Sequence, residues 1–188
     1  TAFLTNESRR RMVDVSHDIY AELWVTPETQ KIWDDFAQNV YEHDDVELSV
    51  RNRYFLEHLK RFIADQRDPV FVNLGAGFTS YPFLVDSKCR SIEVDFQHVI
   101  DFKKQKINLW QEEGKLPKRD IEFLAADFSN ASDIAKLKAA LVEKCGISPT
   151  FFLIEGVTYY LEKSVLERLL NLIGFVQQSG SILGFEYW

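Results

Sequence analysis

The sequence predicts an α/β protein with a doubly wound, mostly parallel sheet behind a helical N-terminal cap. Apolar residues recur at helical spacing through the first third of the chain. From residue 70 onward, short continuous apolar runs alternate with helical patterns. Such alternation indicates parallel strands joined by right-handed crossovers. A glycine-rich turn follows the first run, at the place where α/β sheets of this kind bind ligands.

The N-terminal part is expected to hold at least two helices. Thr26 and Pro27 form a helix-start signal, and apolar residues then recur at helical spacing over 32–41. A second helix is predicted over 48–66, with Asp68-Pro69 ending it. Residues 1–68 would form the cap and 69–188 the core of one compact domain, a reasonable size for a buried core.

Five strands are predicted after the cap. The candidate strands cover residues 70–74, 91–95, 121–125, 151–155 and 181–187. Helical patterns cover residues 134–142 and 165–176, and the second helix opens with Ser164 and Glu167 at capping-box spacing.

Composition narrows the class of partner. The formal net charge is −7, whereas a nucleic-acid-binding protein needs a basic surface. The basic clusters are short: Arg9 to Arg11, read as a solvated face, and Lys103, Lys104 and Lys106. We therefore expect a small-molecule or protein partner and no nucleic acid.

The cysteines and hydropathy indicate a reduced, cytoplasmic protein. Cys89 and Cys145 form no CxxC pair and no metal-ligand set with the four histidines, so no metal is expected. We find no secretory signal and no apolar run long enough to span a bilayer. The chain lacks an initiator methionine, so we expect its start to be trimmed.

The residues that end the predicted strands are the candidate ligand site. They are Gly75, Ala76 and Gly77, then Asp95, Asp127 and Glu155. The glycines allow a tight turn and close approach of a ligand to the backbone. An acid about 20 residues after such a turn binds ribose hydroxyls in nucleotide-type sites.

The remaining strand-end residues suit the other parts of a nucleoside cofactor. Asp127 can accept a hydrogen bond from an adenine amino group, with Phe128 beside it contributing packing and its backbone N–H. Glu155 can face a cationic group. Structural roles stay open: Asp127 with Ser129 and Asn130 could cap the next helix, and Asp95 and Glu155 could be ordinary turn or packing residues.

The glycine turn favours S-adenosyl-L-methionine over a dinucleotide. Dinucleotide sites use G-x-G-x-x-G to seat a pyrophosphate on a helix N-terminus. Here Ser80 takes the third glycine position and Pro82 follows. S-adenosyl-L-methionine has no phosphate, so it does not need that glycine.

Three segments, 72–77, 92–96 and 154–156, resemble the leucine carboxyl methyltransferase family. That family includes protein phosphatase 2A methyltransferases and tetracenomycin-type polyketide O-methyltransferases. The resemblance implies a class I fold and S-adenosyl-L-methionine as cofactor. It also implies that Arg51, with Arg53 as a substitute, pairs with the methionine carboxylate, for which a guanidinium is well suited. Gly75, Asp95, Asp127, Phe128 and Glu155 match the family's cofactor-contacting positions.

The chain departs from the family in two places. Residues 78–84 lack the acid and the arginine that usually follow the glycine loop. The family fold normally has two strands beyond the fifth, so we expect a fragment or an edge covered in another way.

The sequence therefore predicts methyl transfer to a carboxylate or hydroxyl of a small molecule or protein. An ionised carboxylate needs no general base, and no catalytic base is assigned. Tyr20, Tyr159 and Tyr160 are candidates for lining the acceptor pocket, with ordinary packing as the alternative. A catalytically silent binding module and, less well supported, an NAD-dependent oxidoreductase remain alternatives.

Overall fold

The computed structural model describes residues 2–186, which group into two compact units. The helical unit takes in residues up to 61 together with 78–85. The sheet unit takes in residues 62–77 and those from 86 onward. The sequence analysis placed the boundary between residues 68 and 69. In the structure, residues 62–68 belong to the sheet unit and residues 78–85 to the helical unit.

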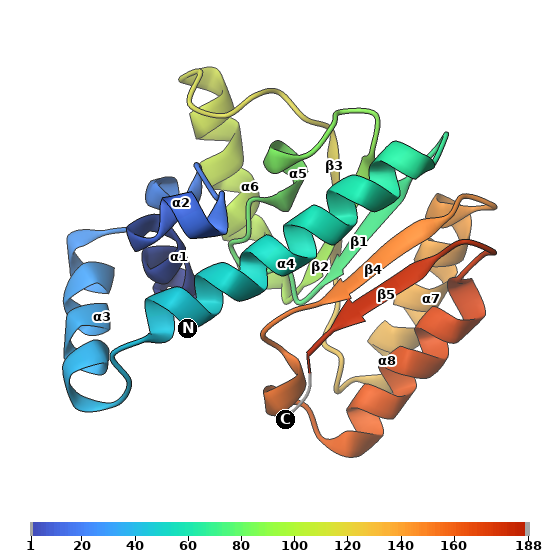
Figure 1. The fold of residues 1–188 in the computed structure, drawn as a ribbon. Helices are drawn as coiled ribbons and strands as arrows, with labels where there is room; N and C mark the ends of the chain where they lie inside the picture. Colours follow the sequence, from blue (N-terminus) through green and yellow to red (C-terminus); the bar gives the residue numbers. More distant parts are fainter. Residues whose placement is uncertain (1, 187–188) are drawn as a thin grey trace. The chain divides into compact units, whose positions relative to one another are not determined.

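The sheet has five strands in the order β3-β2-β1-β4-β5, and all four pairings are parallel (Figure 1). This confirms the predicted α/β class and parallel sheet. The last strand was expected over 181–187, of which Tyr187 lies outside the described residues. The strands are β1 (Val70–Leu74), β2 (Arg90–Asp95), β3 (Ile121–Ala125), β4 (Thr150–Ile154) and β5 (Ile182–Phe185).

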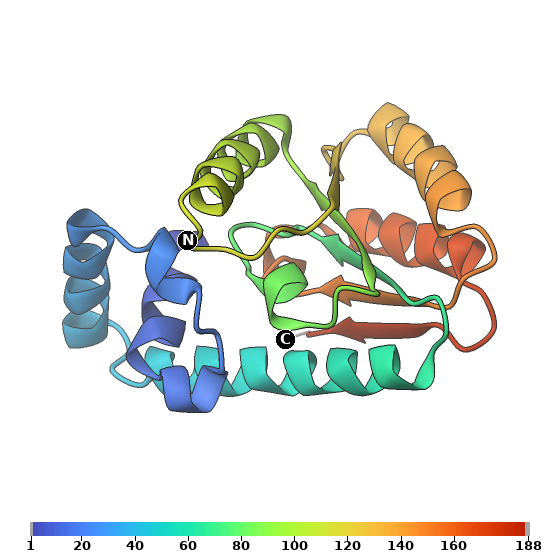
Figure 2. The same cartoon turned by 90° about the horizontal axis from the view of Figure 1, so that it is seen from above.

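Side chains alternate between the two faces of the sheet, and helices cover both. On one face, Val72 of β1 and Phe152 of β4 join the apolar sides of α7 and α8 in a single core. On the other face, Phe71 and Phe151 lie together, and Phe151 meets Phe62 edge to face at 5.7 Å. Figure 2 shows α7 and α8 side by side. The helices of this unit are α6 (Gln97–Glu112), α7 (Ala131–Cys145), the 3-10 turn η2 (Thr158–Tyr160) and α8 (Lys163–Val176).

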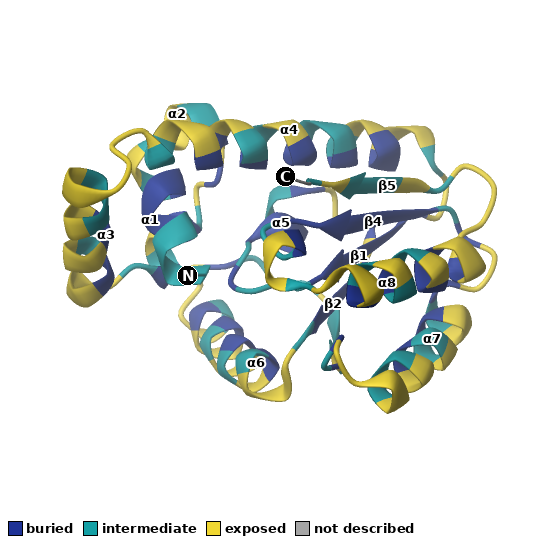
Figure 3. Ribbon diagram, turned by 90° about the horizontal axis from the view of Figure 1, so that it is seen from below, coloured by how far each residue is buried: buried dark blue, intermediate teal, exposed yellow. Residues whose placement is uncertain are grey.

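Burial follows position in the sheet (Figure 3). The inner strands β1 and β4 are buried along their whole length, whereas β3 and β5, at the two ends of the strand order, are partly exposed. A strand covered on both faces favours apolar side chains, which explains why β1 and β4 are apolar apart from Asn73 and Thr150.

The helical unit confirms both predicted helices and adds others. The helix after Thr26 has a capping box: the Thr26 hydroxyl accepts from the Thr29 N–H, and the Thr29 hydroxyl accepts from the Thr26 N–H at 2.8 Å. The helices are α1 (Ala2–Arg11), α2 (Val13–Ser16), η1 (Ala21–Trp24), α3 (Pro27–Asn39), α4 (Asp44–Asp65), which continues into the sheet unit, and α5 (Tyr81–Leu84).

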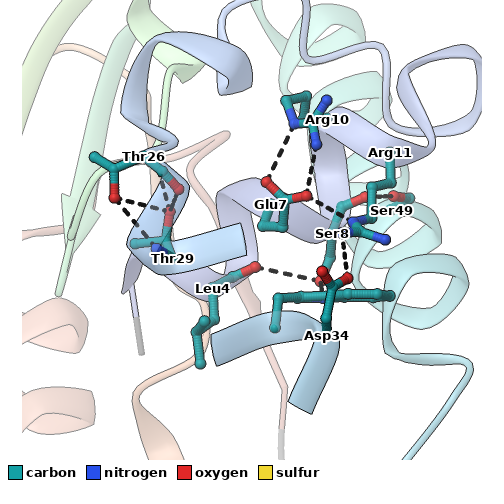
Figure 4. Close-up of polar contacts among 10 residues, drawn as sticks. Leu4, Glu7, Ser8, Arg10, Arg11, Thr26, Thr29, Asp34 and Ser49 are labelled. Carbon is teal, nitrogen blue, oxygen red and sulfur yellow. Dashed lines mark hydrogen bonds and ion pairs between the residues drawn. The ribbon is translucent and has the colours of Figure 1, made fainter. Parts of the chain in front are cut away.

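The sequence suggested that the arginine run on α1 forms a solvated face, but only Arg11 is exposed, whereas Arg10 is partly buried and Arg9 is buried. Arg9 is 1% exposed and lies 3.9 Å from the buried carboxylate of Asp18. The buried Glu7 carboxylate accepts from Arg10 twice, at 2.6 and 3.1 Å, and from Arg11 at 2.6 Å (Figure 4). These arginines therefore neutralise buried acids within the helical unit.

One other local expectation was wrong. Helix α8 begins at Lys163 after the N-cap residue Glu162, two residues too early for Ser164 to act as its cap, and no side-chain cap bond forms. On α3, Trp33 is buried but Ile32 is exposed, as is the C-cap residue Val40. The Trp33 Nε1–H donates to the Ser8 hydroxyl at 2.7 Å, so α3 packs on α1 through a narrow face.

Candidate functional site

The glycine loop connects β1 to the helical unit's residues 78–85. Gly75 and Gly77 both have positive φ, at 79° and 45°. The N–H groups of Gly75 and Ala76 donate to the Val94 carbonyl at 2.8 and 3.0 Å, which folds the loop back over β2. A Cβ on Gly75 would lie 2.3 Å from a Val157 methyl group. Glycine is thus required by both backbone conformation and packing.

Asp95 ends β2 and holds the glycine loop. Its Oδ2 accepts from the Gly77 N–H at 2.7 Å, and its Oδ1 accepts from the Phe96 N–H at 2.7 Å. An ionised carboxylate has about four lone-pair sites, so Asp95 can accept further bonds from ligand hydroxyls. The carboxylate is partly buried, which strengthens such bonds.

Asp127 and Phe128 follow β3. The Asp127 carboxylate accepts from the Ser129 N–H at 2.8 Å. The cap of α7 is Asn130, whose side chain accepts from the N–H groups of Ser132 and Asp133. Asp127 is therefore not the capping residue. The Phe128 ring belongs to the hydrophobic core, which leaves its backbone as the part that could contact a ligand.

Glu155 follows β4 and is 7% exposed. Burial of a carboxylate costs free energy unless hydrogen bonds or an opposite charge compensate for it. Parallel strands end together, so Glu155 lies at the same edge of the sheet as Asp95. The next residues form the turn to η2, in which Val157 packs against Gly75. The ends of β1, β2 and β4 are thus joined by direct contacts.

Glu186 is a strand-end acid that the sequence reasoning missed. Its Oε1 accepts from the Gly156 N–H and from the Tyr159 hydroxyl, the latter at 2.8 Å, and its carbonyl accepts from the Thr158 hydroxyl at 2.8 Å. The signal was available, because Glu186 ends the fifth strand just as Asp95 and Glu155 end theirs.

A second missed feature is an ion pair behind the site. Glu93 of β2 and Lys103 of α6 are both fully buried, with Nζ and Oε2 2.7 Å apart. Burial raises the pKa of Glu93 and the charge of Asp95 adds to this, while Lys103 opposes both. Lys103, which belongs to a short basic cluster in the sequence, is therefore the buried counter-ion of Glu93.

The remaining predicted site residues differ in setting. Tyr160 is exposed, and Tyr159 is half-exposed with its hydroxyl directed to Glu186. Arg51 lies partly buried on α4, and the ring of Tyr20 contacts Phe83 edge to face at 6.2 Å. Both belong to the helical unit, and their roles stay predictions.

Residues 78–84, which depart from the family pattern, are packed into the helical unit. The Phe78 ring stacks on Trp24 at 5.0 Å, and the Phe78 carbonyl accepts from the Asn6 side chain at 3.1 Å. Ser80 is buried and its hydroxyl accepts from the Trp24 indole at 3.3 Å. These side chains serve local packing where the family usually has an acid and an arginine.

Metal and thiol chemistry have no visible support in the described part of the chain. No group of three or more His, Cys, Asp or Glu side chains among residues 2–186 could hold a metal ion. Burial raises the pKa of Cys89 to about 12 and also raises that of Cys145, so both thiols stay protonated near neutral pH. No helix within 2–186 is long and apolar enough to cross a membrane.

Comparison with known proteins finds one matching family model and one similar curated sequence. A model of the leucine carboxyl methyltransferase family matches residues 4–174. A Frankia alni protein, provisionally named as an S-adenosyl-L-methionine-dependent methyltransferase, is 29% identical over 142 residues, covering 73% of this chain. The chain spans about half of that relative, 47% of its length.

Solved structures support the fold. The crystal structure of a DUF574 family protein from Streptomyces avermitilis matches with a TM-score of 0.57 and 17% identity, covering 90% of this chain and 67% of that one. An S-adenosylmethionine-dependent methyltransferase from Clostridium acetobutylicum matches with a TM-score of 0.45 and 13% identity, covering 82% of this chain and 56% of that one. The first match shows the shared α/β fold, and the second is too distant to carry an argument.

Proposed function

Because this chain belongs to the leucine carboxyl methyltransferase family, whose cofactor is S-adenosyl-L-methionine, we propose that it transfers a methyl group from that cofactor to an oxygen acceptor. The observation that carries the proposal is the hydrogen bond from Gly77 to Asp95. It makes the glycine loop and a partly buried acid into one preformed site at the carboxyl edge of the sheet. Ligands bind at this edge in open parallel sheets.

The residues of the sheet unit fit the nucleoside part of the cofactor. Asp95 would accept from the ribose hydroxyls through its remaining lone pairs, while its existing bonds hold it in place. Asp127 would accept from the adenine amino group beside the Phe128 backbone. Gly75 and Gly77, both at positive φ, have no side chains, so a ligand could approach their backbone closely.

The amino-acid part of the cofactor would be bound by opposite charges. Glu155 would face the cationic amino group, and the bidentate pairing of the carboxylate with Arg51 stays an expectation from the family resemblance. The cofactor supplies an electrophilic methyl group on a sulfonium. The chain's own residues orient donor and acceptor for in-line displacement, so positioning should supply much of the rate.

The acceptor is proposed to be an oxygen. A carboxylate is already ionised at neutral pH and needs no general base. Tyr159 and Tyr160 are the tyrosines of the sheet unit proposed to line the acceptor pocket, and the role of Tyr20 in the helical unit stays a prediction. We also propose a cytoplasmic location, as the cysteine content predicts, because thiols stay reduced in that compartment.

The short helix after the glycine loop favours this function over an NAD-dependent one. A dinucleotide's pyrophosphate needs a helix N-terminus directly after the glycine turn. Here α5 has only four residues, and Ser80 before it is bonded to Trp24. Binding of S-adenosyl-L-methionine or its demethylated product, with no binding of NAD, is the expected result in titration calorimetry.

Turnover separates an enzyme from a silent binding module. The bound cofactor should yield S-adenosylhomocysteine when carboxylate and phenol acceptors are supplied. Binding without product formation across such a panel would support the silent module. Failure to bind either sulfur compound would contradict the proposed function altogether.

A further inference from the structure

Glu186 collects three contacts from one short turn. The turn runs from Gly156 to Tyr159, between β4 and α8. Its Gly156 N–H and Tyr159 hydroxyl both donate to Oε1 of Glu186, and its Thr158 hydroxyl donates to the Glu186 carbonyl. Figure 1 shows the end of β5, which leads into Glu186, close to this turn. A charged acceptor forms stronger bonds than a neutral one, so this turn is tied firmly to β5.

The same turn supports the glycine loop. Val157 lies between Gly156 and Thr158, the first and second residues bonded to Glu186. Its methyl group fills the space that a Cβ on Gly75 would occupy, at 2.3 Å. Any shift of the turn would therefore move the contact that closes one side of the glycine loop.

Glu155 is affected by the same anchor. The Gly156 N–H that bonds Glu186 is part of the peptide unit that follows Glu155, and planarity of the peptide transmits its orientation. Glu186, which directly follows β5, is thus bonded to the peptide unit that joins Glu155 to the turn containing Val157.

We propose that Glu186 is a positioning residue, which holds Glu155 and the glycine loop in the geometry that receives the cofactor. It acts through the Gly156–Tyr159 turn and not by touching the reacting atoms. Tyr159 serves the site by donating its hydroxyl to Glu186. The identity of the ligand rests on the proposed function, whereas the anchoring of the turn by Glu186 does not.

The test combines a measurement without ligand and one with ligand. Amide hydrogen exchange is measured by peptide for wild type, Glu186→Ala, Glu186→Gln and the control Glu143→Ala. Glu143 is exposed on α7, so its replacement matches the charge change without touching the turn. Affinity for S-adenosylhomocysteine is then measured by calorimetry on the same proteins, with unfolding free energies recorded alongside.

Glu186→Ala should speed amide exchange about tenfold or more in peptides covering 155–160 and 75–77, because the turn loses charged hydrogen bonds. It should also weaken the affinity for S-adenosylhomocysteine about tenfold. Glu186→Gln keeps an acceptor oxygen and should recover most of both. The control should match wild type. Unchanged exchange in Glu186→Ala, or equal losses in the alanine and glutamine variants, would overturn the inference.

Two further outcomes are separable. If Glu186→Ala does not fold, Tyr159→Phe decides, with faster exchange in 155–160 as the expected result and unchanged exchange as the contradicting one. If wild type binds no sulfur compound, the proposed function fails, while faster exchange in Glu186→Ala still supports the anchor. If wild type binds and Glu186→Ala binds within about twofold, the inference fails and the proposed function stands.

Discussion

The N–H of Gly77 donates to Oδ2 of Asp95 at 2.7 Å, which joins the loop after β1 to the end of β2. Neighbouring parallel strands place these two segments at one edge, and the hydrogen bond fixes their spacing. The candidate site is therefore built by backbone geometry and one carboxylate before any ligand arrives, and this arrangement can be tested by substitution.

Gly75→Ala should destabilise the protein more than an ordinary glycine replacement. Alanine at positive φ costs about 1–2 kcal/mol, and the new Cβ would meet Val157 at 2.3 Å, adding about 1–3 kcal/mol of overpacking. Urea unfolding measures the sum. Gly114→Ala is the matched control, because Gly114 also has positive φ but nothing within 4 Å of a Cβ. Equal losses for the two variants would show that Val157 does not constrain the loop.

Lys103→Met should cost about 3–5 kcal/mol, because it leaves Glu93 as an unpaired buried charge. The double variant Glu93→Leu with Lys103→Met removes both charges and should recover much of that loss. The free energies come from chemical denaturation of both variants and the Glu93→Leu single variant. Additive losses in this cycle would contradict coupling between the two side chains.

The loss in Lys103→Met should also shrink at acidic pH. Burial raises the pKa of Glu93 in the folded state above its unfolded value. Such a carboxyl stabilises the fold most below its unfolded pKa, and that contribution falls as pH rises through the folded pKa. Removing Lys103 raises the folded pKa further. The difference from wild type should therefore be smaller at pH 5 than at pH 7.5, and a difference that does not change with pH would refute this assignment.

Ser148→Ala should weaken stability at neutral pH but not at low pH. The hydrogen bond from the Ser148 hydroxyl, at 2.6 Å, and that from Arg90 lower the pKa of Asp68. A depressed folded pKa gives stability above the unfolded pKa, which is lost as pH falls through the folded value. Asp68 is largely exposed, so we expect about 0.5–1.5 kcal/mol from the bond at pH 7. Thermal or urea unfolding near pH 3 should show the gap closing.

The sheet was predictable because a strand that is buried on both faces consists mostly of apolar residues. Residues such as Val70 and Phe152 belong to continuous apolar runs, and a parallel sheet needs such runs. The edge at which Gly75, Asp95 and Glu155 meet then follows from parallel pairing alone. For the same reason, the start of α3 was recognisable from Thr26 and Pro27, whose capping preference is local.

The features that the sequence concealed depend on contacts between distant residues. Arg9 and Lys103 look like surface charges until their partners Asp18 and Glu93 are placed beside them. Glu186 gains its importance from hydrogen bonds to a turn some 30 residues earlier, which no local pattern records. Charged side chains are ordinarily exposed, so a buried pair contradicts the local expectation and appears only in the folded chain.

The central claim is that the cofactor lies at the carboxyl edge of the sheet with its ribose on Asp95. The most direct measurement is the affinity of Asp95→Ala for S-adenosylhomocysteine, against wild type and Asp120→Ala, an exposed acid before β3 at the opposite edge. Loss of a charged hydrogen bond costs about 1.5–3 kcal/mol, so we predict affinity lower by about tenfold or more for Asp95→Ala alone. An affinity within about twofold of wild type would contradict the assignment.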